Sequence, residues 1–521
     1  MANNRTKNTL MNTSFAVISR IVSMVMGFIL KTVFIRTLGK AYTGISGLFS
    51  DILVMLSLAE LGIGSAISFS LYKPLAETNY QKVAQLMNFF KVAYRIIALI
   101  VLTVGLALLP LLSVIVKDVP EIVEDIRLIY ILYVINSAVS YLLVYKNTLL
   151  IADQKQYIVS TTQMVFTIIK VVIEVVLLLC FKQFLIYLIL EILLTLGQNI
   201  TINILAAKRY RELKPYEKEK LSKEERKKIF KDIWALMLYK VSNVVLTGTD
   251  STIVSSALGT GQVGVLGNYK TIQGYVTSMV AQFYNSVNPS LGNLAATESK
   301  EVQYNFFKKL NFATFWIACF CSVCFFTLFN PFIEIWLGDN SWLLPLTTVA
   351  VFVLDYFLSA ISGPIGAFRI ANGLFVQTKY QSIIMAGLNL AISILLVKPL
   401  GILGVLIGTV VSRLLTHVWY EPLVIYKNVF GKSVWLYYGK LLLQATITVL
   451  GCFAIWGIMQ LLPTMNIWME FAVRVELCII IPNFMIILIF YRTQEFKQCI
   501  AFAKNLFVKL ILKIFKRRKN G

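Results

Sequence analysis

The sequence predicts an all-α integral membrane protein of about fourteen transmembrane helices. Of its 521 residues, 58% are hydrophobic and only 14% are charged, whereas a soluble domain averages about 45–50% apolar and 25% charged residues. Apolar runs of about 20 residues, the length that spans a bilayer as a helix, follow one another along the chain. These observations exclude a large soluble enzyme, a disordered chain and a fibrous protein.

The apolar runs define the predicted helices in order. Short polar or charged stretches separate them, and some runs lie so close together that they must form antiparallel pairs, such as 157–181 with 184–206. The predicted spans are 12–36, 43–71, 84–112, 126–146, 157–181, 184–206, 232–257, 269–295, 310–330, 343–368, 380–397, 402–426, 441–462 and 469–491.

The distribution of basic residues gives the orientation. With a cytoplasmic N-terminus, the inner segments hold 35 Lys and Arg residues and the outer loops hold 6. Cytoplasmic loops carry the excess of Lys and Arg in membrane proteins. The sequence therefore predicts a multi-pass membrane protein with both termini in the cytoplasm.

A strongly basic segment, 207–231, divides the chain nearly in half. It carries eleven Lys and Arg residues, and Ser222 followed by Glu225 is typical of a capping box that opens the next helix. We expect an N-terminal lobe (1–206, spans 1–6), this cytoplasmic linker (207–231) and a C-terminal lobe (232–426, spans 7–12). Spans 13 and 14 then lie within 427–491, and 492–521 forms a basic amphipathic helix on the inner leaflet.

An internal repeat relates the two lobes. Residues 37–47 align with 257–267 at a constant offset of 220, so that Leu38 matches Leu258 and three glycines of each segment coincide. The matched glycines are Gly39/Gly259, Gly44/Gly264 and Gly47/Gly267. Because six spans separate the copies, the lobes should have the same orientation and be pseudo-symmetric.

No motif indicates an enzyme, a metal or a cofactor. The seven cysteines lie in or next to apolar runs and form neither a disulfide framework nor a metal site. The pattern G-x-G-x-x-G at 259–264 joins two membrane helices, whereas a dinucleotide fold requires a strand before it. A complete phosphate-binding loop is also absent from the sequence, so nucleotide hydrolysis is not expected to drive the protein directly.

Basic residues inside the spans indicate a hydrated, positively charged cleft. A charge at the bilayer centre costs at least ~2.5–3.5 kcal/mol, so such residues face water or a partner. Arg20 and Lys31 share one stripe of the first span, while Lys240, Asn243 and Asp250 share a stripe of the seventh. The other candidates are Lys270, Gln273 and Asn285 in the eighth span and Arg413 in the twelfth. Polar contacts between helices are the alternative for each stripe.

Buried acids are a second group. Glu60, Asp250 and Asp355 could pair with these cations or couple transport to a proton or sodium ion. Lys170 and Glu174, one turn apart, could neutralise each other. Arg413 has His417 one turn away, and we expect this histidine to be a satisfied packing residue. A cleft with surplus positive charge suits an amphiphile whose anionic head is a phosphate or diphosphate.

The segments Thr37–Leu53 and Leu58–Ile67 resemble the multidrug/oligosaccharidyl-lipid/polysaccharide (MOP) exporter superfamily, and specifically its bacterial polysaccharide branch of Wzx-type flippases. The resemblance implies a MATE-like fold with a cleft lined by spans 1, 2, 7 and 8, and an alternating-access mechanism. It also implies a substrate of undecaprenyl-diphosphate-linked oligosaccharide, exported for capsular or other surface polysaccharide. Glycosyltransferases and a polymerase of the same pathway would be partners.

Three other functions remain open. The first is a flippase for a lipid-linked peptidoglycan precursor, and the second is a cation-coupled drug exporter of the same fold, which should have a cleft dominated by acids. The third is a membrane scaffold without transport, which has no use for the intramembrane cations.

Overall fold

The computed structural model describes residues 2–56, 70–75, 77–116, 122–153, 155–216, 219–227, 229, 248–501 and 504. The regular structure of these residues is helical, without a β-strand. This confirms the predicted all-α class. The described helices fall into two compact units, residues 1–268 and 269–521.

Ten of the described helices are long and apolar enough to cross a membrane. An eleventh crossing results if α5 and α6, which are bent by 42° at a short break, form one span. Much of the predicted spans 43–71 and 232–257 lies outside the described residues, and so does most of the amphipathic tail 492–521. The total of fourteen spans therefore remains a prediction.

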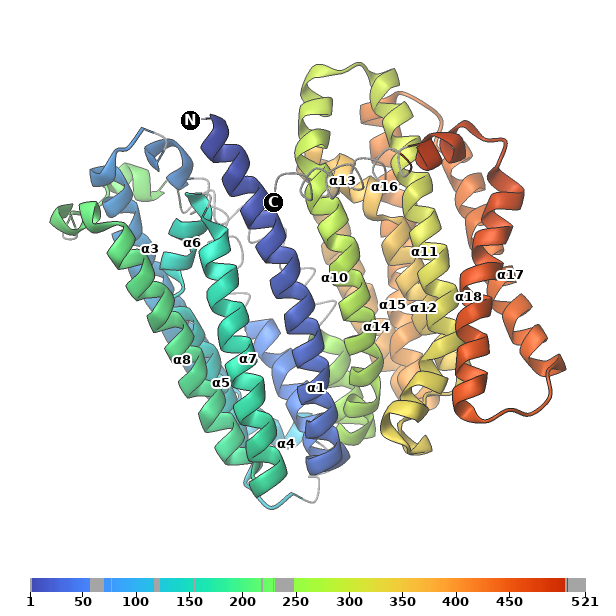
Figure 1. Cartoon of the computed structure of the whole chain (residues 1–521), viewed down its shortest axis with the longest axis horizontal. Coiled ribbons are helices and arrows are strands. Elements are labelled where there is room, and N and C mark those ends of the chain that lie inside the picture. Colours follow the sequence, from blue (N-terminus) through green and yellow to red (C-terminus); the bar gives the residue numbers. More distant parts are fainter. Residues whose placement is uncertain are drawn as a thin grey trace, which may run out of the picture. The chain divides into compact units, whose positions relative to one another are not determined.

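In the first unit, long helices pack side by side (Figure 1). Helix α1 packs against α7, α3 packs against α5, and α8 packs against both α5 and α7. The elements are α1 (Ala2–Leu56), α3 (Tyr80–Ala107), η2 (Leu109–Leu111), α4 (Leu112–Ile115), α5 (Ile126–Leu142), α6 (Tyr145–Ala152), α7 (Gln156–Phe181), α8 (Phe184–Arg209) and η3 (Arg211–Tyr216).

In the second unit, α11 is the central element and contacts α12, α17 and α18. Helix α15 packs against α12 and α14. The elements are α10 (Thr260–Thr297, which begins in the first unit), α11 (Lys300–Leu337), η4 (Asn340–Trp342), α12 (Leu346–Ile361), α13 (Gly363–Ala371), α14 (Phe375–Leu400), α15 (Ile402–Leu415), α16 (His417–Ile425), the π-helical turn η5 (Tyr426–Phe430), α17 (Trp435–Leu461) and α18 (Ile467–Phe490).

Large apolar side chains lie on both the inward and the outward surfaces of the helices. On α3, Phe90 and Tyr94 are buried in a hydrophobic core, whereas Val92, Ile96 and Leu99 are more than half exposed. A helix that is apolar on both faces is typical of a membrane span, because lipid replaces water on its outer side. The burial pattern therefore agrees with the predicted multi-pass membrane protein.

Polar residues at the ends of the apolar runs set the helix boundaries. The side chains of Asn79 and Asp125 accept backbone N–H groups at the first turns of α3 and α5, which otherwise lack partners. The C-terminal end of α11 turns at Gly338, with a φ of 68°. The predicted capping box in the linker is also confirmed, since Ser222 and Glu225 each accept the other's backbone N–H.

The predicted loops 36–47 and 256–267 are wrong as loops, because the chain is helical through both except at one glycine. Gly39 has φ 81° and Gly259 has φ 88°, values in the left-handed region that only glycine adopts without a penalty. A single such residue redirects the helix, so no longer loop is needed. The two positions are the ones paired by the offset of 220, and their shared conformation supports the internal repeat.

The repeated segments also contact each other through their backbones. A Cβ at Gly44 would lie 2.0 Å from the carbonyl oxygen of Thr260, and a Cβ at Gly264 would lie 3.4 Å from the carbonyl oxygen of Lys40. Lys40 and Thr260 are themselves equivalent in the repeat, so the contact is pseudo-symmetric. It requires glycine at position 44, since any side chain would overlap the facing main chain.

We predict that Gly44→Ala destabilises the protein, whereas Gly267→Ala does not. The added methyl group at position 44 would force the two segments apart, and overpacking of this kind costs about 1–3 kcal/mol. Gly267 is the matched control because a Cβ there meets no heavy atom within 4 Å. Thermal unfolding of the detergent-solubilised variants measures the difference. Equal unfolding midpoints for both variants would contradict the proposed role of the contact.

Candidate functional site

Two of the candidate cations lie on the first half of α1. The Arg20 side chain is exposed and that of Lys31 is half-buried. Eleven residues separate them, which is about three helical turns or ~16 Å along the axis. The two charges therefore lie on one stripe of α1, as expected from the sequence, but a single phosphate cannot contact both without movement of the side chains.

Asp250 lies beside a polar connection to α1. It is buried in the helical segment 248–258, and the neighbouring Ser251 donates a hydrogen bond to the carboxylate of Asp51 on α1. On the same face, a Cβ at Gly248 would lie 2.5 Å from the Cγ atom of Met55. The candidate residue is therefore held at a close helix contact, not in an open space.

A polar pocket of about 460 Å³ lies within the first unit. It is formed by the second half of α1 together with α5 and α8, and the Tyr133 hydroxyl donates a hydrogen bond to Ser46 Oγ at its wall, at 2.7 Å. Its lining includes the hydroxyl, amide and carboxyl groups of Ser46, Ser50, Tyr133, Asn136, Ser137, Ser140, Tyr141, Tyr187, Glu191 and Thr195. Such a lining can hold water or a small cation inside an otherwise apolar lobe.

An ion cluster adjoins this pocket. Lys170 Nζ on α7 lies 2.6 Å from Glu191 Oε1 on α8 and 4.0 Å from Glu174 Oε1. The expected pairing of Lys170 with Glu174 is therefore present, but Glu191 is the closer partner and was missed. An acid in the middle of the apolar run 184–206 was the available signal. With two carboxylates and one ammonium, the cluster needs a further proton or cation to become neutral.

In the second unit, the candidates on α10 are only partly enclosed. Lys270 and Gln273 are half-buried, and the side chain of Asn285 lies outside those described. Further along the helix, the Tyr284 hydroxyl lies 2.7 Å from Thr314 Oγ1 on α11. Part of the polar stripe on α10 thus makes contacts between helices, which was the alternative reading of these stripes.

Arg413 and Asp355 form an ion pair. Arg413 Nε on α15 donates to Asp355 Oδ1 on α12 at 2.8 Å, and each side chain is 19% exposed. The expectation that Asp355 pairs with an intramembrane cation is confirmed, and adjacent helices bring it into contact with Arg413, 58 positions away in sequence. A candidate substrate ligand and a candidate coupling acid therefore neutralise each other in this conformation.

His417 belongs to a second ion cluster. Its Nδ1 atom lies 2.9 Å from Glu421 Oε2, and Arg369 Nη1 lies 2.8 Å from Glu421 Oε1. Glu421 is fully buried and the Arg369 side chain is only 5% exposed. This arrangement agrees with the interpretation of the histidine as a packing residue, and it connects α13 to α16.

The remaining candidates are not placed. Lys240, Asn243 and Glu60 lie outside the described residues. In the described part of the chain, no group of three or more His, Cys, Asp or Glu residues has the geometry of a metal site. In the second unit, Arg413 forms an ion pair with Asp355. In the first unit, Arg20 and Lys31 lie about three helical turns apart on α1.

We predict that the single substitutions Asp355→Asn and Arg413→Gln each lower the unfolding midpoint, and that the double variant recovers most of the loss. Removing one partner leaves a half-buried charge without compensation, whereas removing both does not. A coupling energy of about 0.5–3 kcal/mol is expected from a double-mutant cycle. Additive effects would show that the pair is not coupled. If the double variant is stable but does not transport, the pair also acts in the transport cycle.

Comparison with known proteins identifies the family and the fold. The family model described as "Polysaccharide biosynthesis protein" matches residues 9–294. No curated protein sequence matches the chain. Among solved structures, the lipid II flippase MurJ in an inward closed conformation superposes with a TM-score of 0.66 at 13% identity, covering 91% of this chain and 98% of MurJ.

Two MATE transporters superpose comparably. An inward-facing MATE family transporter of the MOP superfamily gives a TM-score of 0.61 at 14% identity, covering 79% of this chain and 98% of its own. The MATE transporter VcmN of Vibrio cholerae, in its bent form, gives 0.56 at 12% identity, covering 82% and 98%. These likenesses show that the chain has the same fold as MurJ and these MATE transporters. Because the family model matches more than half of the chain, the protein belongs to the polysaccharide biosynthesis protein family.

Proposed function

We propose that this protein is a flippase that moves an undecaprenyl-diphosphate-linked oligosaccharide from the inner to the outer leaflet of the bacterial cytoplasmic membrane. The observation that carries the proposal is the combination of a polysaccharide biosynthesis family with surplus basic residues inside the membrane spans. A glycan carrier lipid joins these two features in one molecule, since it carries a sugar chain and a negatively charged diphosphate. The protein binds and moves this molecule without changing its bonds.

The positions of the cations support an anionic head group. Arg20 and Lys31 place two positive charges along α1, and an ammonium or guanidinium group is a strong ligand for phosphate oxygens. Lys240 and Lys270, in the spans of the second repeat, are the other proposed cationic ligands of the diphosphate. The apolar outer faces of the helices would allow the polyprenyl tail to remain in the bilayer while the head group crosses.

A cycle of alternating access follows from the glycine contact. The repeat segments at Gly44 and Gly264 touch in this conformation, and both lie on the side that the charge distribution predicts to be outer. Opening toward the outside would separate them. Gly39 and Gly259, the single non-helical residues beside the contact, would provide the change in backbone direction.

The energy source has two candidates. The cluster of Lys170, Glu174 and Glu191 needs an extra proton or cation for neutrality, so it could exchange one during the cycle, as could Asp250. Alternatively, the membrane potential favours outward movement of an anion by ~2.3 kcal/mol per charge per 100 mV. Imposing ion gradients and a potential separately on proteoliposomes would distinguish these possibilities.

Two other cargoes remain candidates within this fold. A lipid-linked peptidoglycan precursor also carries a diphosphate, and MurJ, which superposes on this chain, is described as a lipid II flippase. A cationic drug is less compatible with the basic residues of α1. Competition between an oligosaccharide-linked lipid, lipid II and a cationic dye in one transport assay would rank the three. A scaffold without transport would move none of them.

We predict that Arg20→Ala and Lys31→Ala each slow transport at least about ten-fold, because hydrogen bonds to a charged group contribute ~1.5–3 kcal/mol. Arg20→Lys should be milder, since it keeps the charge. The readout is the movement of a fluorescent polyprenyl-diphosphate sugar in proteoliposomes. Lys73→Gln, at a side chain that is 84% exposed, serves as the control for loss of one charge. Full transport by the double alanine variant would show that neither residue is needed for substrate binding.

We further predict that joining the repeat segments blocks transport. The side chain of Lys40 passes 3.7 Å from the position of a Cβ at Gly261, so cysteines at 40 and 261 could be joined by a short reducible cross-linker in a background without the seven native cysteines. Transport should stop on cross-linking and return on reduction. Each single cysteine variant, treated in the same way, is the control. Unchanged transport by the cross-linked protein would exclude separation of this contact as a step in the cycle.

A further inference from the structure

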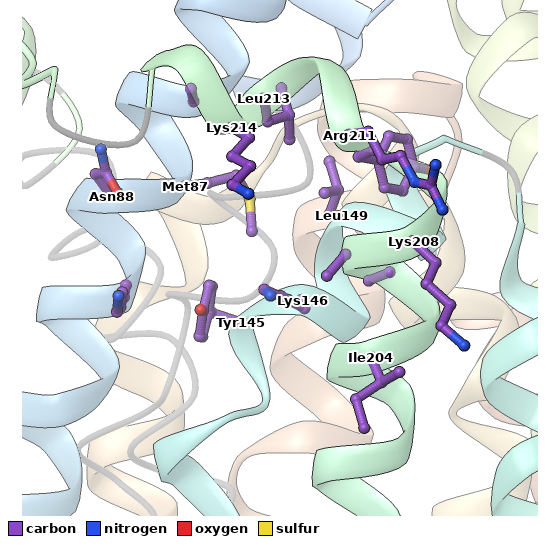
Figure 2. Close-up of a pocket in the computed structure, with 15 residues that line it drawn as sticks. Met87, Asn88, Tyr145, Lys146, Leu149, Ile204, Lys208, Arg211, Leu213 and Lys214 are labelled. Carbon is purple, nitrogen blue, oxygen red and sulfur yellow. The ribbon is translucent and has the colours of Figure 1, made fainter.

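A cavity of about 730 Å³ lies in the first unit, away from the stripe on α1. It is enclosed by α3, α6, the last turn of α8 and η3 at the start of the basic linker (Figure 2). These are the ends of the helices on the side predicted to be cytoplasmic. Ligand pockets commonly occupy ~300–1,000 Å³, so the space suffices for a substantial head group.

The cavity is strongly basic. Among its fifteen lining residues, five carry a positive charge and none is acidic. They come from four different elements, so the cavity gathers charges that are distant in sequence. The five are Lys91, Lys146, Lys208, Arg211 and Lys214.

The local fold explains how the linker contributes to this charge. Arg211 and Lys214 are three residues apart on η3, and residues i and i+3 of a 3₁₀ turn lie on the same side. Figure 2 shows the Lys214 side chain reaching from η3 into the space above Lys146 and Tyr145. Opposite elements thus present ammonium groups to one space, as a bound anion requires.

The part of the linker that follows the cavity lining is anchored on α3. Asn88 donates a hydrogen bond to the backbone oxygen of Glu219 at 3.0 Å, and Gln85 donates to the Glu219 carboxylate at 2.9 Å. Lys82 pairs with Glu225, the residue of the capping box. Within the lining itself, η3 packs directly against α3.

Two nearby acids, Asp153 and Glu225, are paired with other cations, whereas Glu212 and Glu219 lie outside the cavity lining. Asp153 pairs with Lys155 and accepts a hydrogen bond from the Tyr210 hydroxyl at 2.6 Å. Burial and this hydrogen bond raise the pKa of Tyr210, so the hydroxyl keeps its proton and adds no negative charge. The hydrogen bond from Lys82 lowers the pKa of Glu225. Neither acid is therefore available to cancel the positive charge of the cavity.

We infer that this cavity is a binding site for a phosphate-bearing anion. The five cations supply charge-assisted donors, the Tyr145 and Tyr210 rings and the side chains of Met87, Leu149 and Leu213 supply an apolar boundary, and bound phosphate groups are recognised by this combination of charge and shape. The anion is either the head group of an inner-leaflet lipid or a free diphosphate. The inference is independent of the transported substrate, because the site lies apart from the α1 cations.

The test measures binding of two probes to the full-length protein in detergent at constant ionic strength. Inorganic pyrophosphate is titrated by microscale thermophoresis, and phosphatidylglycerol is scored as a retained adduct by native mass spectrometry. The variant is Lys146→Gln with Lys214→Gln. The matched control is Lys220→Gln with Lys223→Gln, which removes the same charge from linker positions outside the cavity.

We expect the cavity variant to weaken binding of at least one probe about ten-fold or more, and the control to stay within about two-fold of the native protein. Binding of pyrophosphate alone identifies a free anion as the ligand, and binding of phosphatidylglycerol alone identifies a lipid head group. If the glutamine variant loses binding and also has a lowered unfolding midpoint, the double variant Lys146→Arg with Lys214→Arg separates loss of charge from loss of fold. This variant keeps both charges and must bind the probe. Absence of saturable binding by the native protein, or equal losses in variant and control, would overturn the inference.

Discussion

The close approach of two backbones at Gly44 and Gly264 constrains much of the first unit. Because a side chain at position 44 would overlap the carbonyl group of Thr260, the two repeat segments can approach this closely only with glycine at position 44. The contact brings the segment 248–264 against α1, which in turn allows Ser251 to reach the carboxylate of Asp51. Polar groups that are far apart in sequence therefore meet because two glycines leave room for main chain.

A second constraint is the cost of charge in a membrane, which the protein meets in two ways. Arg413 with Asp355, and Arg369 with Glu421, are paired across helices, so these charges stabilise the second unit instead of lining an open cleft. The cluster around Lys170 is different, since it joins one cation to two acids beside a polar pocket. In the proposed transport cycle, this imbalance would let the cluster take up and release a proton or cation.

Sequence reasoning predicted the fold better than the site. A span must be apolar to lie in the bilayer, and a helix satisfies its own backbone hydrogen bonds there. The apolar runs and the Lys and Arg distribution could therefore predict the all-α class and the helices without knowledge of the packing. The repeat glycines predicted a turn, although not that one residue suffices for it. Asp355 was recognised as an acid that could pair with an intramembrane cation, but the choice of Arg413 could not be predicted, because only packing determines which helices meet. Glu191 was visible as an intramembrane acid, but its proximity to Lys170 required the structure.

The same positive charge has different consequences at different depths. On the linker side, the cations of the cavity remain charged at little cost because water reaches them. They would bind a phosphate supplied by the anionic inner leaflet. Within the spans, the same attraction must be reversible, because a carrier that binds its cargo equally well throughout the cycle cannot release it. The membrane potential, negative inside, assists departure of an anion by ~2.3 kcal/mol per charge per 100 mV. In the proposed cycle, release would depend on weaker cation contacts in an outward-open state, in which the Gly44 and Gly264 segments would have separated.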